Sequence, residues 1–101
     1  MDERDLYSGL IRLYILHHAD RVPIFGLGLI EELGRRGHRV SAGTLYPILH
    51  GLEAKGYLRS TRRRAGGKIR RVYRTTPSGR RALTVARTKI RQLFGELVED
   101  A

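Results

Sequence analysis

The side chains of this sequence that could take part in chemistry are mostly cations. The 101 residues hold 20 Lys and Arg against 10 Asp and Glu, and no Cys, which excludes disulfides and thiol chemistry. Four histidines remain, His17, His18, His38 and His50, and they do not follow a zinc-site spacing. The sequence has no paired-carboxylate spacing, no His-x-x-x-His motif and no phosphate-cradling glycine loop. We therefore expect that the protein is not an enzyme and binds neither a metal nor a cofactor.

The positive charge is concentrated in one stretch of the chain. Residues 1–54 carry six basic and seven acidic side chains, whereas residues 55–91 carry fourteen basic and no acidic ones. The last ten residues add only Glu96, Glu99 and Asp100. A solubilising surface usually mixes both signs, so a contiguous basic block favours a polyanion as the partner.

Length and composition indicate one soluble, globular, intracellular domain. With 41% hydrophobic and 30% charged residues, the chain is too apolar for a disordered tail. No stretch approaches the roughly 18 apolar residues that a membrane span requires. The start of the chain, Met1 to Asp5, is acidic where a signal peptide would be basic. We therefore expect a cytoplasmic protein with no membrane partner.

Three helices are predicted in the first half of the chain. Apolar residues recur at helical spacing from about Asp5 to Ala19, on more than one face, which indicates burial against both its own domain and a second copy. A second helix is expected from about Phe25 to Arg36, and a third before Gly56, with Leu45, Ile48, Leu49 and Leu52 inward. Two short helices joined at Gly37 are typical of a helix-turn-helix.

Pro47 leaves two possible starts for the third helix. If Ser41 is the cap, Pro47 loses a hydrogen bond and its ring crowds the carbonyl of Gly43. If Thr44 is the cap, Pro47 lies in the first turn at little cost. The residues themselves are compatible with both.

A basic hairpin is predicted next. Residues that favour strands run from Tyr57 to Arg63 and from Ile69 to Thr75, separated by Ala65-Gly66-Gly67-Lys68. Six cations flank its tip: Arg62, Arg63, Arg64, Lys68, Arg70 and Arg71. The order of helix, turn, helix and basic hairpin predicts a mainly α fold with a small β-hairpin, a winged helix-turn-helix.

The last helix is expected from the cap Thr76 and Pro77 to about Val98. Its apolar residues are spaced like a short coiled-coil seam, and at about 1.5 Å per residue it is longer than so small a body needs. We expect residues 1–76 to form the winged domain and residues 77–101 a dimerisation helix. The predicted dimer interface is Leu6, Leu10, Leu13, Ile90, Leu93 and Leu97.

The chain resembles the PadR-like family of bacterial transcriptional regulators from about Leu10 to Leu83. The resemblance rests on the strings Ser41-Ala42-Gly43-Thr44-Leu45-Tyr46-Pro47-Ile48-Leu49, Leu52-Glu53, Gly56-Tyr57-Leu58, Arg70-Arg71-Val72-Tyr73-Arg74 and Thr76-Pro77-Ser78-Gly79. It implies a homodimeric repressor that binds an inverted repeat in a promoter and releases it on a signal.

Two features depart from the family pattern. Members often show a Gly-Tyr pair at the start of the second helix, whereas here Gly26 is followed by Leu27. The single carboxy-terminal helix is similar to the short subgroup, which lacks an extra helical domain. A pocket for any small-molecule effector would therefore have to be built at the dimer interface.

The predicted DNA contacts come from the third helix and the wing. On that helix the outward residues are Ser41, Ala42, Thr44, Tyr46 and His50. Ser41 and Thr44 can instead serve only as caps, Tyr46 can pack under the wing, and His50 can be a solvated residue. No Arg or Asn on this face offers a bidentate base contact, so we expect recognition partly by DNA shape, with wing arginines in a narrow minor groove.

Two other functions fit the same residues. Backbone electrostatics do not separate double-stranded DNA from RNA, so an RNA-binding or ribosome-associated winged helix is one alternative. A winged helix that mainly binds proteins through its apolar faces is the other.

Overall fold

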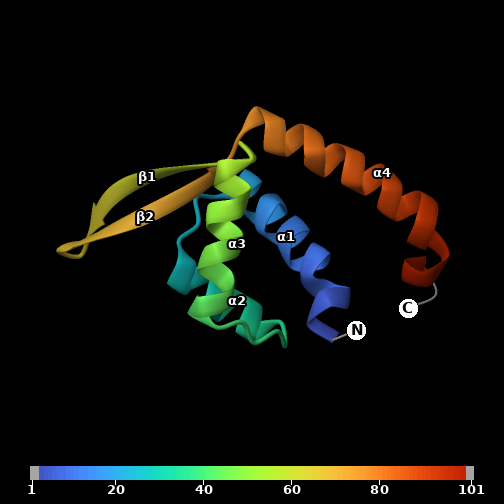
Figure 1. Cartoon of the computed structure of the whole chain (residues 1–101), viewed down its shortest axis with the longest axis horizontal. Helices are drawn as coiled ribbons and strands as arrows, with labels where there is room; N and C mark the ends of the chain where they lie inside the picture. The colour runs from blue at the N-terminus through green and yellow to red at the C-terminus, as the bar shows by residue number, and fades with distance from the viewer. Residues whose placement is uncertain (1–2, 100–101) are drawn as a thin grey trace.

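Residues 3–99 are described by the computed structural model, and the elements follow the predicted order (Figure 1). They are α1 (Glu3–Arg21), α2 (Gly26–Arg35), α3 (Ala42–Ala54), β1 (Leu58–Ala65), β2 (Lys68–Thr75) and α4 (Pro77–Glu99). Figure 1 shows the hairpin projecting on one side of the three packed helices and α4 on the other. The predicted winged helix-turn-helix, mainly helical with one small hairpin, is confirmed.

The first helix is longer than its pattern predicts. It begins at Glu3 and continues past Ala19 to Arg21. The chain leaves the helix only near Pro23, which disfavours the α conformation in the residue before it. Ile15, Leu16 and Ala19 are buried on its inner face.

The helix-turn-helix is closed by a glycine and a serine. Gly37 has a φ of 87°, and the amide of His38 donates to the carbonyl of Leu33 at 2.8 Å, the bond that ends many helices. The hydroxyl oxygen of Ser41 accepts from the amide of Thr44 at 3.2 Å. Of the two predicted starts of α3, the structure has the one capped by Ser41.

Pro47 therefore lies inside α3. Proline has no amide hydrogen, so the carbonyl of Gly43 lacks its helical partner, an arrangement that costs about 3 kcal/mol in a helix interior. The opposite face of the helix offsets this cost, because Leu45 and Leu49 are fully buried there.

The hairpin closes through a two-residue turn, which is shorter than the predicted gap between the strands. Gly66 and Gly67 have φ values of 58° and 79°, as a type I′ turn requires. Arg64 and Ala65 consequently join β1, and Lys68 joins β2. At the base of the hairpin, Ile24 forms a bridge to Tyr73 with backbone bonds of 3.0 and 2.7 Å.

One core joins all these elements. Its buried residues are Ile15, Leu16, Ala19, Ile24, Leu29, Leu33, Leu45, Leu49, Leu52, Leu58, Tyr73 and Leu83. A buried bond from the hydroxyl of Thr75 to the carbonyl of Leu16, at 2.7 Å, ties the end of β2 to α1. The core thus fixes the base of the hairpin against α1 and α3, while its tip extends beyond the body (Figure 1).

Only the first part of α4 is held by the core. Thr76 is its cap, as predicted, accepting from the amide of Gly79 at 3.0 Å and donating to the carbonyl of Gly56 at 2.6 Å. Arg80 pairs with Asp20 at the end of α1 at 2.8 Å. Leu83 is buried, whereas Leu93 is 73% exposed. The far part of α4 therefore presents an apolar surface without a partner in the described chain.

Candidate nucleic-acid interface

The amino-terminal end of α3 forms one part of the candidate interface. Ser41, Ala42 and Thr44 are exposed there, and His50 is exposed further along the same helix. The hydroxyl of Ser41 also donates to that of Thr44 at 3.2 Å, so both residues serve the cap. Their exposure leaves oxygen atoms accessible at a helix end whose free amides attract anions.

Tyr46 lies differently from the other residues predicted on this face. It is half-buried and packs against the core rather than facing outward. Its ring occupies the space next to Gly26, and a Cβ at that position would overlap the phenol. The ring centre of Tyr46 is 6.5 Å from that of His50. Tyr46 thus joins α3 to the start of α2 and supports the exposed residues around it.

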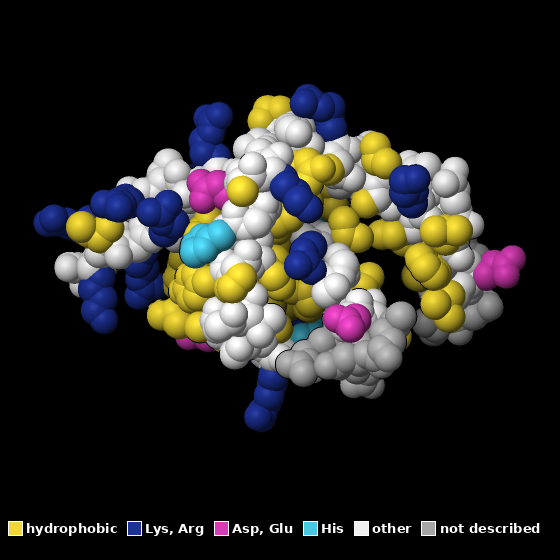
Figure 2. All heavy atoms as spheres, viewed as in Figure 1, with side chains coloured by type: hydrophobic (Ala, Val, Ile, Leu, Met, Phe, Trp, Pro, Cys, Tyr) yellow, Lys and Arg dark blue, Asp and Glu magenta, His cyan; other side chains and the backbone are white. Residues whose placement is uncertain are grey.

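The wing forms the second part. Arg62, Arg63, Arg64 and Lys68 are exposed at its tip. Figure 2 shows Lys and Arg side chains clustered over the projecting hairpin, at the left of the view. Two cation pairs face each other across the strands, Arg62 with Arg71 and Arg63 with Arg70. Like charges directly opposite in a hairpin repel, so this surface is suited to a partner that neutralises it.

Arg70 and Arg71, predicted as DNA contacts, have partners within the chain. The guanidinium carbon of Arg70 lies 4.6 Å from the centre of the Phe25 ring. Arg71 donates to the hydroxyl of Ser60 at 3.0 Å. Of the six wing cations, four are thus exposed at the tip, Arg70 is half-buried against Phe25, and Arg71 is exposed but bonded to Ser60.

Three residues that were not among the predicted DNA contacts hold the wing: Phe25, Glu53 and Ser60. A carboxylate oxygen of Glu53 accepts from the amide of Ser60 at 2.9 Å and from its hydroxyl at 2.6 Å. The side-chain bond from Ser60 is the largest cause that lowers the pKa of Glu53, and the charge of Arg71 adds to it. Glu53 is the last acidic residue before the basic block of residues 55–91. This position was the one signal in the sequence that could have indicated a contact between Glu53 and the wing.

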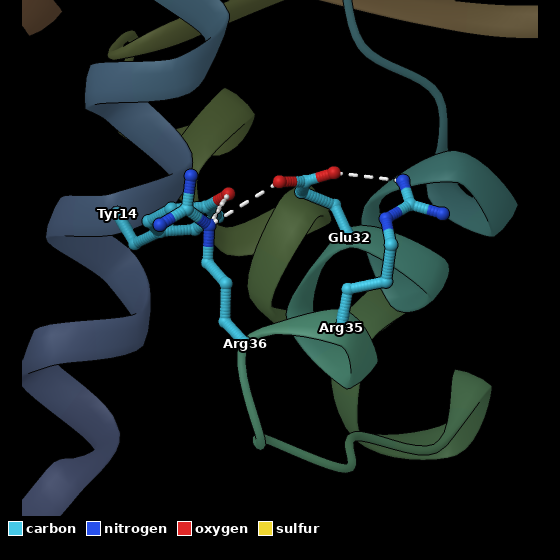
Figure 3. Close-up of polar contacts among 4 residues, drawn as sticks. All are labelled: Tyr14, Glu32, Arg35 and Arg36. Atoms are coloured by element: carbon cyan, nitrogen blue, oxygen red, sulfur yellow. Dashed lines mark hydrogen bonds and ion pairs between the residues drawn. The ribbon is translucent and has the colours of Figure 1, made fainter.

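The end of α2 is tied to α1 by a polar network (Figure 3). Arg36 donates to the hydroxyl of Tyr14 at 3.0 Å, and its guanidinium carbon lies 5.3 Å from the centre of that ring. Glu32 lies between two cations, 2.7 Å from Arg35 and 3.3 Å from Arg36. The hydrogen bond from Arg35 is the first cause that lowers the pKa of Glu32. The network holds the helix-turn-helix against α1.

An apolar groove lies between α1, α3 and the far part of α4. Its space is about 870 Å³. Of the predicted interface, Leu6, Leu10, Leu13, Ile90 and Leu97 line it, whereas Leu93 does not. Leu6, Leu10, Leu93 and Leu97 are exposed, and Leu13 and Ile90 are half-buried. Figure 2 shows hydrophobic side chains on the facing sides of α4 and the body.

Residues 3–99 contain neither a cluster of metal ligands nor a membrane span. No group of three or more His, Cys, Asp or Glu in this range could hold a metal ion. No helix in the same range is both long and apolar enough to cross a membrane.

Known proteins are similar to this chain in sequence and in fold. The Transcriptional regulator PadR-like family matches residues 15–85. "Transcriptional regulator Rv3488" of Mycobacterium tuberculosis is 50% identical over 95 residues, which cover 94% of this chain and 89% of that protein. A PadR family regulator from Eggerthella lenta has a TM-score of 0.80 at 32% identity, over 96% of this chain and 88% of its own.

A PadR-like transcription factor from Bacteroides fragilis has the same fold, with a TM-score of 0.82 at 22% identity over 98% of this chain and 97% of its own. The family match covers both the helix-turn-helix and the basic hairpin. The chain therefore belongs to the PadR-like family and is a transcriptional regulator of a DNA-binding class, not an enzyme.

Proposed function

We propose that this protein is a homodimeric repressor that binds an inverted repeat in promoter DNA in the cytoplasm. The observation that supports this most is the pairing of an exposed helix end with a projecting, exposed cationic hairpin. Ser41, Ala42 and Thr44 lie at the first, and Arg62, Arg63, Arg64 and Lys68 at the second. This arrangement matches a helix in the major groove with a wing on the neighbouring backbone or minor groove.

The two parts of the interface do different work in this proposal. The wing cations supply affinity by replacing counterions on phosphates, without reading bases. The exposed end of α3 reads sequence through short hydroxyl groups and the methyl group of Ala42, and the imidazole of His50 does so further along the helix. Because α3 has no Arg, Lys or Asn, base readout is sparse and part of the specificity comes from groove shape.

A two-fold dimer would account for an inverted repeat as the binding site. A second copy can cover the apolar groove and the exposed residue Leu93 beside it, burying the leucines of α1 and α4. A two-fold dimer presents two α3 helices to DNA, so two half-sites should lie about one helical turn apart, roughly 10 base pairs centre to centre.

Salt dependence of duplex binding tests the wing. We expect the triple change Arg62→Gln, Arg63→Gln, Arg64→Gln to weaken binding and to reduce the slope of log K against log salt by about 0.9 for each phosphate that the variant no longer neutralises. The matched control removes Arg87, Lys89 and Arg91, which are exposed on α4. Equal slope changes in both variants would show that only total charge matters and would contradict the proposed interface.

Competition between duplex DNA and structured RNA tests which class of nucleic acid the protein binds. The protein should prefer a palindromic duplex selected from random DNA over structured RNA at moderate salt. A preference for the RNA would favour an RNA-binding winged helix instead. Absence of affinity for either nucleic acid would favour a module that binds proteins.

A further inference from the structure

Phe25 and Arg70 form a contact between the wing and α2, on the tip side of the bridge between Ile24 and Tyr73. Phe25 occupies the cap position of α2, and Arg70 lies on β2 opposite Arg63. The guanidinium carbon of Arg70 is 4.6 Å from the ring centre. On β2, Arg70 is half-buried while its neighbours Ile69 and Arg71 are exposed. Arg70 is thus turned toward the body rather than outward with the tip.

The Phe25 ring is itself held in place. A Cβ at Gly28 would lie 3.0 Å from the Cζ atom of this ring, so the ring packs directly on the backbone of α2. The ring is therefore bounded by Gly28 and Arg70. A side chain fixed in this way can support a cation without a large loss of rotamer entropy on DNA binding.

The opposite strand of the wing has its own attachment. Glu53, near the end of α3, accepts two bonds from Ser60 on β1, and Ser60 accepts one from Arg71 on β2. The wing is consequently tied to α3 through β1 and to α2 through β2. An isolated two-stranded hairpin is only marginally stable, and this one has facing arginines, so such ties decide where its tip points.

We propose that Phe25 is a positioning residue for DNA binding, which acts by stacking on Arg70 and so fixes the angle of the wing relative to α2 and α3. This inference rests on the proposed DNA-binding function. The tip cations Arg62, Arg63, Arg64 and Lys68 contact DNA, whereas Arg70 contributes through Phe25. Phe25 is uncharged and offers no hydrogen bond to a phosphate, so its effect on affinity reports wing placement.

The first test replaces the aromatic ring. A cation–π contact at a partly exposed site contributes about two- to fivefold to an equilibrium constant, and we expect Phe25→Leu to weaken duplex binding by this factor with an unchanged salt slope. Phe25→Tyr keeps the ring and should bind like the wild type. Leu27→Ala, an exposed change nearby on α2, is the control for general effects and should also bind normally.

A double-mutant cycle tests whether Arg70 acts through Phe25. Arg70→Gln should weaken binding in the wild type but cause no further loss in the Phe25→Leu background. If Arg70 contacts phosphate directly, it will instead lower affinity and the salt slope equally in both backgrounds, and that result would overturn the inference.

A measurement without DNA separates the inference from the proposed function. Trypsin cleaves after the wing arginines, and a loosened wing should be cut faster in folded Phe25→Leu than in Phe25→Tyr, with circular dichroism as the check on folding. Equal cleavage together with equal DNA affinity would refute the role of Phe25. A wild-type protein that binds no duplex would contradict the proposed function, whereas the cleavage comparison would still report on the stack.

Discussion

At the scale of single residues, Tyr46 and Gly26 depend on each other. The phenol ring of Tyr46 occupies the space that a Cβ at residue 26 would need. This contact sets how closely α2 and α3 approach, and therefore the direction in which the exposed end of α3 points. A glycine at the start of α2 is thus required by the aromatic residue on α3.

We expect Gly26→Ala to lower the free energy of unfolding by about 1–3 kcal/mol, because overpacking in a tight contact displaces the ring or the backbone. The matched control is Gly34→Ala on the same helix, where a Cβ meets nothing within 4 Å. That change should raise the free energy of unfolding by up to about 1 kcal/mol, since alanine favours a helix more than glycine does. Urea denaturation measures both.

The origin of the Gly26→Ala effect is checked by removing the ring. Most of the loss should disappear when Gly26→Ala is made in a Tyr46→Ala background. Additive effects of the two changes would show that the contact between these residues is not the cause.

At the scale of elements, α3 and the hairpin are coupled by Glu53. The bonds from Ser60 and the charge of Arg71 lower the pKa of this carboxyl group in the folded protein. A lowered folded pKa means that the charged group stabilises the fold above its usual pKa of 4.5 and that this contribution disappears as the pH falls through the folded value.

We expect Glu53→Gln to reduce the free energy of unfolding by about 1–2 kcal/mol at pH 7, as hydrogen bonds to a charged group are removed. The difference from the wild type should shrink as the pH is lowered below 4.5 toward pH 3, in urea titrations at each pH. Glu31→Gln, at an exposed site on α2, is the control and should have little effect. A difference that stays constant with pH would contradict the role of the Glu53 charge.

The elements themselves could be predicted because their signals are local. The helical spacing of leucines located α2, α3 and α4 within a few residues, and Gly66-Gly67 located the turn of the hairpin. The start of α3 needed the structure, because Ser41 and Thr44 both satisfy the capping pattern. The contacts of Phe25 with Arg70 and of Glu53 with Ser60 join different elements, and no periodicity in one segment encodes them.

At the scale of the whole molecule, the exposed leucines of α1 and of the far part of α4 lie away from the tip of the wing (Figure 1). The groove between these helices is the surface on which the proposed dimer depends. The sequence predicted its leucines as an interface from the wide apolar face of α1 and the length of α4, but it could not predict the groove itself, which depends on how the far part of α4 lies relative to α1 and α3.

We expect the double change Leu93→Glu, Leu97→Glu to give a monomer in sedimentation experiments and to weaken duplex binding, because two-site binding is lost. Val85→Glu is the matched control, since Val85 is an exposed apolar residue of α4 outside the groove lining. It should remain dimeric. Dimers of unchanged stability in the double variant would place the interface elsewhere on the molecule.

The facing arginines of the hairpin have a consequence for how the protein responds to ionic strength. Arg62 opposes Arg71, Arg63 opposes Arg70 and Arg59 opposes Arg74. Added salt screens this repulsion in the free protein, but it also removes the entropy gained from counterion release on DNA. Between roughly 50 and 200 mM salt, the melting temperature of the free protein should therefore rise while its affinity for DNA falls. The same cations that destabilise the unbound wing by repelling one another are the groups that a bound duplex neutralises and holds in place.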